Sequence, residues 1–309
     1  MKNGNRKFFQ GEVMHIYQRA IHGFNIFYTL EDYLVFYTIF SVFVRRFKIT
    51  ALALCLMIDH FHALLVCESK RTLSNFISSV TSLYSRLFNE TVGRQGRLFD
   101  KSFGSAPKIG DKLVRTAIAY LLNNPVEKNL CFNPEEYRWN FLAYLEHESP
   151  FSSKLIRRNV SKKLYGAIRE VEQCRTNEKW LNYTQLRRLY SGLKESEYEH
   201  LTDFIISAYL PFDKEQLLSY YKSYEMLKLA VKSNTGSEYS IREDYNSYSD
   251  SQYSDIAKFI AVRLSSSPKS LLTMSLDEKL EMAKTLASGT SAANRQIAKY
   301  LHIPLKKQK

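Results

Sequence analysis

Residues 56–66 read LMIDHFHALLV, an apolar run that two histidines interrupt. Apolar runs of this length that are rich in Leu and Val are typical of buried strands. Because a strand turns successive side chains to opposite faces, His60 and His62 point to one side and Phe61 points to the other. Two neighbouring imidazoles can bind one metal ion, although the pair by itself is a weak motif.

The segments around this run predict an alternation of strands and helices. Strands are expected at 13–20, 48–58, 60–67 and 98–103, and helices at 29–47, with Thr29 as N-cap, and at 72–90. The resulting order, β-α-β-β-α-β, is the ferredoxin-like arrangement, so the sequence predicts an α+β domain with an antiparallel sheet. Since this fold hosts many functions, the function has to come from the site.

A third helix is predicted at 111–123, with Pro125 ending it or lying just past its end. Tyr120 and Asn124 are four residues apart, so they share one face near the helix C-terminus. The first domain is expected to close at residue 146.

The charge of the chain points to a polyanionic partner. The formal net charge is +13, and both halves are basic: residues 1–147 hold 18 Lys and Arg against 12 Asp and Glu, and the remainder holds 26 against 19. A basic surface gains affinity for phosphates through counterion release, and nucleic acid ranks ahead of membrane because no basic amphipathic helix dominates.

The longest uncharged apolar run, 33–44, is too short to span a bilayer, and the polar N-terminus has no signal-peptide core. The four cysteines form no C-x-x-C pair, so a reduced, cytoplasmic protein is expected.

The C-terminal half is expected to be helical. Residues 147–264 are predicted to form a helical extension with a mobile polar loop near 232–255, and residues 265–309 a helix-turn-helix-like module. In that module Arg295 and Gln296 are expected to be exposed and to contact DNA. An ordinary helical hairpin has the same pattern, so DNA binding and protein binding both stay open here.

Three blocks of sequence together resemble the HUH single-tyrosine (IS200-like) transposases, and more closely their REP-associated branch. Residues 57–64 resemble the metal strand M-x-N-H-x-H-x-L of that family, and residues 84–89 and 93–99 resemble its helix and basic turn, Y-x-x-x-x-N…G-R-x-G-x-L-F. Residues 120–126 resemble the nucleophile helix, Y-I-x-x-N-P-V. The resemblance covers about residues 13–145.

The resemblance implies a chemistry and a set of residues. Tyr120 would attack a DNA phosphodiester, leaving a 5′-phosphotyrosine and a free 3′-hydroxyl. His60, His62 and Asn124 would hold Mg²⁺ or Mn²⁺. The implied partner is single-stranded or hairpin DNA in a bacterial cytoplasm, a homodimer is left open, and the DNA would lie in a cradle of Arg86, Asn89, Arg94, Arg97 and Lys101.

The sequence departs from the family pattern at Asp59 and at Leu122, which stands where many relatives have a polar residue. Asp59 replaces the usual Asn before the first histidine, and its side chain is expected to face away from His60 and His62. His15 is expected to be structural or superficial, and His302 has no visible partner.

Two other functions compete with DNA cleavage. A domesticated relative could bind hairpin DNA or RNA and repress without cutting, but a pure binder has no need of His60, His62 and Tyr120 together. A ferredoxin-like RNA-binding module would need exposed aromatic pairs on a central strand, and Phe61 alone is insufficient.

Overall fold

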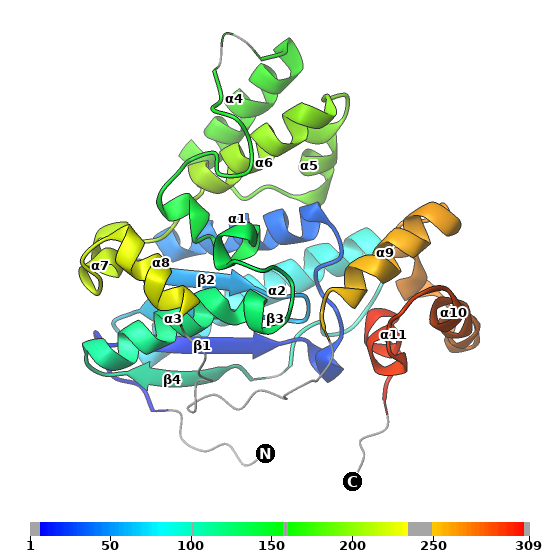
Figure 1. Cartoon of the computed structure of the whole chain (residues 1–309), viewed down its shortest axis with the longest axis horizontal. Coiled ribbons are helices and arrows are strands. Elements are labelled where there is room, and N and C mark those ends of the chain that lie inside the picture. The colour runs from blue at the N-terminus through cyan, green and yellow to red at the C-terminus, as the bar shows by residue number, and fades with distance from the viewer. Residues whose placement is uncertain (1–6, 101, 157, 159, 234–248, 306–309) are drawn as a thin grey trace.

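A four-stranded antiparallel sheet lies at the centre of the computed structural model, with the strand order β2-β3-β1-β4 (Figure 1). The structure describes residues 7–100, 102–156, 158, 160–233 and 249–305. The elements of the first domain are β1 (Val13–Arg19), α1 (Leu30–Arg46), β2 (Thr50–Leu56), β3 (His60–Val66), α2 (Lys70–Val92), β4 (Gly104–Lys108) and α3 (Asp111–Glu127). This order and this topology confirm the predicted ferredoxin-like arrangement.

The two faces of the sheet are covered differently. Phe61 of β3 faces α1, where its ring centroid lies 5.0 Å from that of Phe36, and α1 and α2 pack together on this side. Helix α3 packs on the opposite face, against β2, β3 and β4 (Figure 1). The alternation of β3 therefore directs Phe61 into the main core and both histidines towards α3.

Helix α1 begins as the sequence predicts, with Thr29 as its N-cap in a capping box with Asp32. Asp32 Oδ2 accepts the backbone N–H groups of Tyr28 and Thr29, each at 2.9 Å. The other oxygen, Oδ1, accepts from Tyr183 at 2.7 Å and from Lys269 at 2.8 Å. One fully buried carboxylate thereby ties the start of α1 to two segments from the C-terminal half.

The fourth strand differs from the prediction at 98–103. Leu98 and Phe99 are buried, and Phe99 makes only an isolated bridge to Ala20. Strand β4 follows at 104–108 and pairs with β1, with Pro107 opposite Met14. Because β4 is an edge strand, the missing N–H of a proline is tolerated there. The sequence GSAPK has a low strand propensity, so local reasoning did not predict a strand at these residues.

Helix α3 is longer than predicted and contains Pro125. The chain turns only at Lys128, whose N–H donates to Asn124 O at 3.1 Å, and Leu130 N–H donates to Pro125 O at 2.9 Å. A proline in the last turn removes one hydrogen bond without stopping the helix, and these two bonds close its end.

The helical extension packs on α1 and β2 rather than standing apart. Its helices are α4 (Lys162–Thr176), α5 (Tyr183–Tyr190), α6 (Glu195–Ala208), α7 (Lys214–Ser219) and α8 (Tyr224–Lys232). The Tyr37 hydroxyl of α1 donates to Ile206 O at 2.8 Å, and Asp213 N–H donates to Ala51 O of β2 at 2.9 Å. These helices share one continuous hydrophobic core with the sheet.

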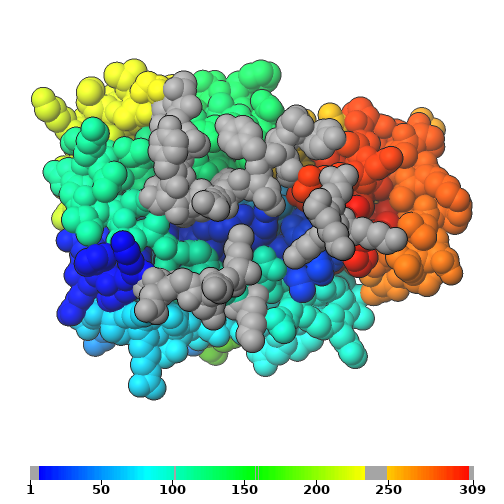
Figure 2. Space-filling view, turned by 90° about the horizontal axis from the view of Figure 1, so that it is seen from below, coloured from blue at the N-terminus to red at the C-terminus, as the bar shows by residue number. Residues whose placement is uncertain are grey.

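The last three helices lie at one end of the molecule, beside the start of α1 (Figure 1), and the same end is seen from below in orange and red in Figure 2. They are α9 (Gln252–Arg263), α10 (Leu276–Gly289) and α11 (Asn294–Tyr300), and all three contribute to a second hydrophobic cluster. The boundaries at 146/147 and 264/265 stay predictions, and most of the polar loop predicted near 232–255 lies outside the described residues. None of the described helices has the length and apolarity that a membrane span requires.

Candidate functional site

His60 and His62 lie on the face of the sheet that α3 covers. Their partners across the ladder are Arg19 and Tyr17 of β1. The Tyr17 ring centroid lies 5.3 Å from that of His60 and 5.0 Å from that of His62, and the two imidazoles are 5.0 Å apart. Both histidines are buried. The period of the strand thus brings two imidazoles side by side, as the sequence predicts.

Helix α3 brings Tyr120 and Asn124 to the same place. The Tyr120 ring centroid lies 5.9 Å from that of His62, and Asn124 Nδ2 donates to the Tyr120 hydroxyl at 3.3 Å. Tyr120 is 4% exposed and Asn124 is fully buried. The four-residue spacing on a helix and the two-residue spacing on a strand therefore converge on one site.

Asp59 turns towards His60, contrary to the prediction that it faces away. Its Oδ1 lies 2.5 Å from His60 Nδ1, and its Oδ2 lies 3.6 Å from Arg19 Nε and 3.6 Å from Lys299 Nζ. Burial alone would raise the pKa of Asp59, but the attraction and hydrogen bond of His60, with the two cations, hold this pKa well below its ordinary range. The prediction was wrong because a residue at the turn before a strand is not bound to the alternation of the strand, and two cations attract its carboxylate.

His15 is a site residue that sequence reasoning missed. It is fully buried on β1, its Nε2 lies 3.0 Å from His62 Nδ1, and its ring centroid lies 6.0 Å from that of Tyr120. The alternation of β1 offered a signal, because His15, Tyr17 and Arg19 must share one face. No local sequence pattern showed that β1 pairs with β3 in a register that places His15 beside His62.

The donor set fits a divalent cation. Asp59 contacts Nδ1 of His60, and His15 contacts Nδ1 of His62. Each of the two metal-binding rings would therefore bind a metal through Nε2, and the group at Nδ1 would set its tautomer. Asn124 Oδ1 is buried and has no hydrogen-bond partner among the described residues. No three His, Cys, Asp or Glu side chains converge on a metal position within the described chain, so a cation here would rely on two imidazoles and one amide oxygen. Such a mixed set of imidazole and carbonyl ligands suits Mn²⁺ at least as well as Mg²⁺, which prefers oxygen ligands.

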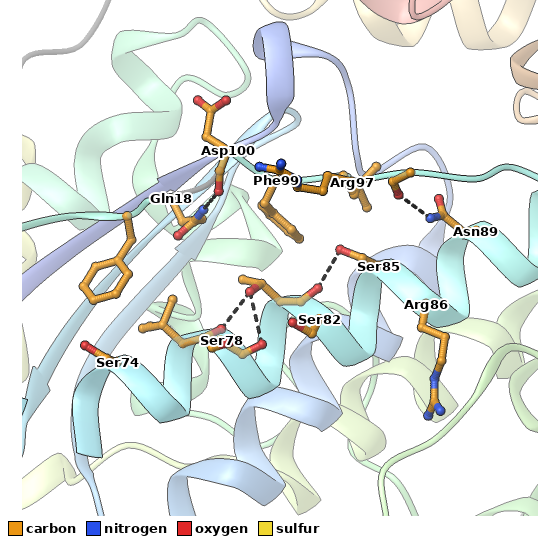
Figure 3. A pocket seen from close by; sticks show the side chains of 15 residues that line it. Gln18, Ser74, Ser78, Ser82, Ser85, Arg86, Asn89, Arg97, Phe99 and Asp100 are labelled. Carbon is orange, nitrogen blue, oxygen red and sulfur yellow. Dashed lines mark hydrogen bonds between the residues drawn. The ribbon is translucent and has the colours of Figure 1, made fainter. Parts of the chain in front are cut away.

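The proposed DNA cradle lies beside a groove on the other face of the sheet. This groove has a volume of about 650 Å³ and runs between α2 and a segment formed by residues 96–100 and Phe103 (Figure 3). Gln18 points into it from β1, opposite a row of hydroxyl side chains on α2, and Phe99 and Arg97 lie on its other wall. Arg86 and Arg97 are exposed and line the groove.

The other predicted cradle residues have different surroundings. Asn89 donates from Nδ2 to Gly96 O at 2.7 Å and accepts from Arg94 Nη1 at 2.9 Å, and Arg94 Nη2 donates to Arg97 O at 3.0 Å. Asn89 and Arg94 therefore hold the basic turn in shape. Lys101 lies outside the described residues.

The C-terminal module exposes one of the two side chains that were predicted to contact DNA. Arg295 is exposed, but Gln296 is buried, contrary to expectation. Its Oε1 accepts the N–H of Ala293 at 3.0 Å and its Nε2 donates to Ser249 O at 2.7 Å. Gln296 thus caps α11 and joins it to the preceding segment, a role that no local pattern distinguishes from an exposed one.

The chain is similar to a known family and to a solved structure. Residues 14–124 match the family described as Transposase IS200 like. A solved structure of a REP-associated tyrosine transposase bound to a REP hairpin is similar to 47% of this chain and 84% of its own, at 14% identity and a TM-score of 0.40. No curated protein matched the chain.

Proposed function

We propose that this protein, whose residues 14–124 match the family described as Transposase IS200 like, cleaves and rejoins single-stranded DNA through Tyr120. The observation that carries the proposal is the convergence of Tyr120 and Asn124 with His60 and His62 at one buried site. A family domain with an altered site could still bind DNA, but it would not need all four side chains together.

The attack would proceed at the phenol oxygen of Tyr120. This oxygen forms a bond to the scissile phosphorus while the bond from phosphorus to the 3′ oxygen breaks, and that oxygen takes up a proton to leave a 3′-hydroxyl. The amide of Asn124 donates a hydrogen bond to this phenol oxygen and would orient it for the attack. The phosphotyrosine keeps the bond energy, so a second 3′-hydroxyl can attack the phosphorus and release Tyr120 with its proton.

The remaining side chains would orient the reacting groups. His60 and His62 would hold a divalent cation with Asn124 Oδ1, and such a cation polarises a phosphate and stabilises developing charge. Asp59 and His15 would hold the rings of His60 and His62 in place through their contacts at the two Nδ1 atoms. We propose single-stranded or hairpin DNA as substrate, with part of the strand held along the groove at Arg86 and Arg97. A homodimer stays a prediction.

A labelled oligonucleotide tests the proposal. With Mn²⁺ or Mg²⁺, a single-stranded hairpin substrate labelled at its 3′ end should transfer its label to the protein, whereas a label at the 5′ end should leave with the free 3′-hydroxyl fragment. Tyr120→Phe should abolish the adduct while the affinity for DNA stays within about twofold. A Tyr120→Phe protein that still forms the adduct would refute the role of this residue, and a wild type that binds without any adduct would favour the non-cleaving binder.

Tyr84→Phe is a matched control. Tyr84 is also buried, and its hydroxyl donates to Ile26 O at 2.7 Å, but it lies in α2 on the other face of the sheet. This variant should keep the adduct despite a loss of stability of about 1 kcal/mol.

A further inference from the structure

Helix α11 is packed directly against the segment that precedes the histidine strand. The Tyr28 hydroxyl donates to Tyr300 O at 2.8 Å, and the side chain of Ile58 belongs to the same apolar cluster as Ile297 and Leu301. In the space-filling view the described residues near the C-terminus, in red, lie beside those near the N-terminus, in blue (Figure 2). Ile58 is two residues before His60, so the C-terminal helices contact the turn that leads into the strand carrying both histidines.

Lys299 extends this contact to the site itself. It is 6% exposed, and its Nζ lies 3.6 Å from Asp59 Oδ2. The opposite oxygen of the same carboxylate holds His60 Nδ1 at 2.5 Å. Gly23 borders this lysine: a Cβ on Gly23 would lie 3.4 Å from Lys299 Cε, and its φ of +65° suits glycine. The lysine is therefore enclosed, with its charge directed at Asp59.

We propose that Lys299 is a positioning residue that orients His60 through Asp59, so that the C-terminal helix is part of the metal-binding site. This inference rests on the proposed function. The physical reason is the aspartate, which stands where the resembling family has an uncharged asparagine. A carboxylate that lies in hydrogen-bond contact with a metal-binding imidazole can turn either to the ring or to the metal ion. Lys299 and Arg19 hold its second oxygen, so that the first stays on His60 Nδ1.

A purely structural lysine would behave differently. If Lys299 only held α11 in place, its loss would have the same effect whether residue 59 were Asp or Asn. If it acts through the carboxylate, its loss matters only while that carboxylate is present. A double-mutant cycle between positions 59 and 299 separates the two cases.

The experiment measures Mn²⁺ affinity of the full chain by isothermal titration calorimetry. Lys299→Met should weaken binding about tenfold in the Asp59 protein and less than about twofold in the Asp59→Asn protein. Lys299→Arg should retain the affinity, and Lys279→Met, a half-buried lysine in α10 of the same module, should leave it unchanged. Equal losses in both backgrounds, or no loss in either, would overturn the inference.

A second readout needs no metal. In a ¹⁵N-detected spectrum of the histidines, assigned with His60→Gln, the wild type should show His60 protonated at Nδ1, and Lys299→Met should show a mixture of tautomers. An unchanged tautomer in Lys299→Met would overturn the inference. If the wild type bound no Mn²⁺, the proposed metal site would fail, and the spectrum would still decide whether Lys299 orients His60.

Discussion

His302 makes the docking of the C-terminal helix sensitive to pH. Its Nε2 donates to Asn25 O at 2.8 Å, its ring stacks on Phe24 at a centroid distance of 4.5 Å, and its buried Nδ1 has no partner among the described residues. Burial, with Arg94 and Lys279 nearby, lowers the pKa of His302 from 6.5 to about 3, despite the opposing effect of the Asn25 carbonyl.

The sign and size of the effect follow from proton linkage. Between about pH 6.5 and about pH 3 the unfolded chain binds a proton at His302 and the folded chain does not. The contribution of neutral His302 to the free energy of unfolding is therefore fully present above this range and is lost as the pH falls through it. Each pH unit in this window removes about 1.4 kcal/mol. From about pH 7.5 to about pH 5 this one group should lower the free energy of unfolding by about 2 kcal/mol.

Urea unfolding of the wild type and of His302→Asn measures this contribution. Asparagine keeps a donor for the Asn25 carbonyl and accepts the positive φ of 56° at this position, but it does not titrate. The other titrating groups are common to both proteins, so the wild type should lose about 2 kcal/mol more than the variant over this pH interval. The amide protection factors of α11, which are corrected for the intrinsic pH dependence of exchange, should fall with acid in the wild type alone. Equal losses in the two proteins would refute the assigned pKa.

Two further predictions concern the site and the groove. His15→Phe should lower Mn²⁺ affinity about tenfold because His62 loses the partner of its Nδ1. His15→Gln retains an acceptor and should lower the affinity less. If calorimetry showed that both variants bind Mn²⁺ as the wild type does, the prediction would be wrong. Arg97→Ala should weaken single-stranded DNA binding and reduce the slope of log affinity against log salt by about one without abolishing the adduct, and an unchanged slope would mean that this guanidinium contacts no phosphate.

Much of the site follows from local periodicity. The alternation of β3 puts His60 and His62 on one face, and the turn length of a helix does the same for Tyr120 and Asn124. The start of α1 at Thr29 is equally local, because a capping box involves only neighbouring residues. These features depend on backbone geometry over a few residues, so they can be predicted without knowledge of the rest of the fold.

The tertiary structure decided what surrounds those four side chains. His15 meets His62 because of the register of β1 against β3, and Lys299 reaches Asp59 because an apolar cluster holds α11 beside Ile58. Gln296 is buried by the same packing. Contacts between residues 47 or 240 positions apart depend on strand register and on how apolar faces fit together, and one sequence expresses neither as a local pattern. The sequence by itself determined which side chains can carry the chemistry, and the packing of distant segments determined which groups orient them.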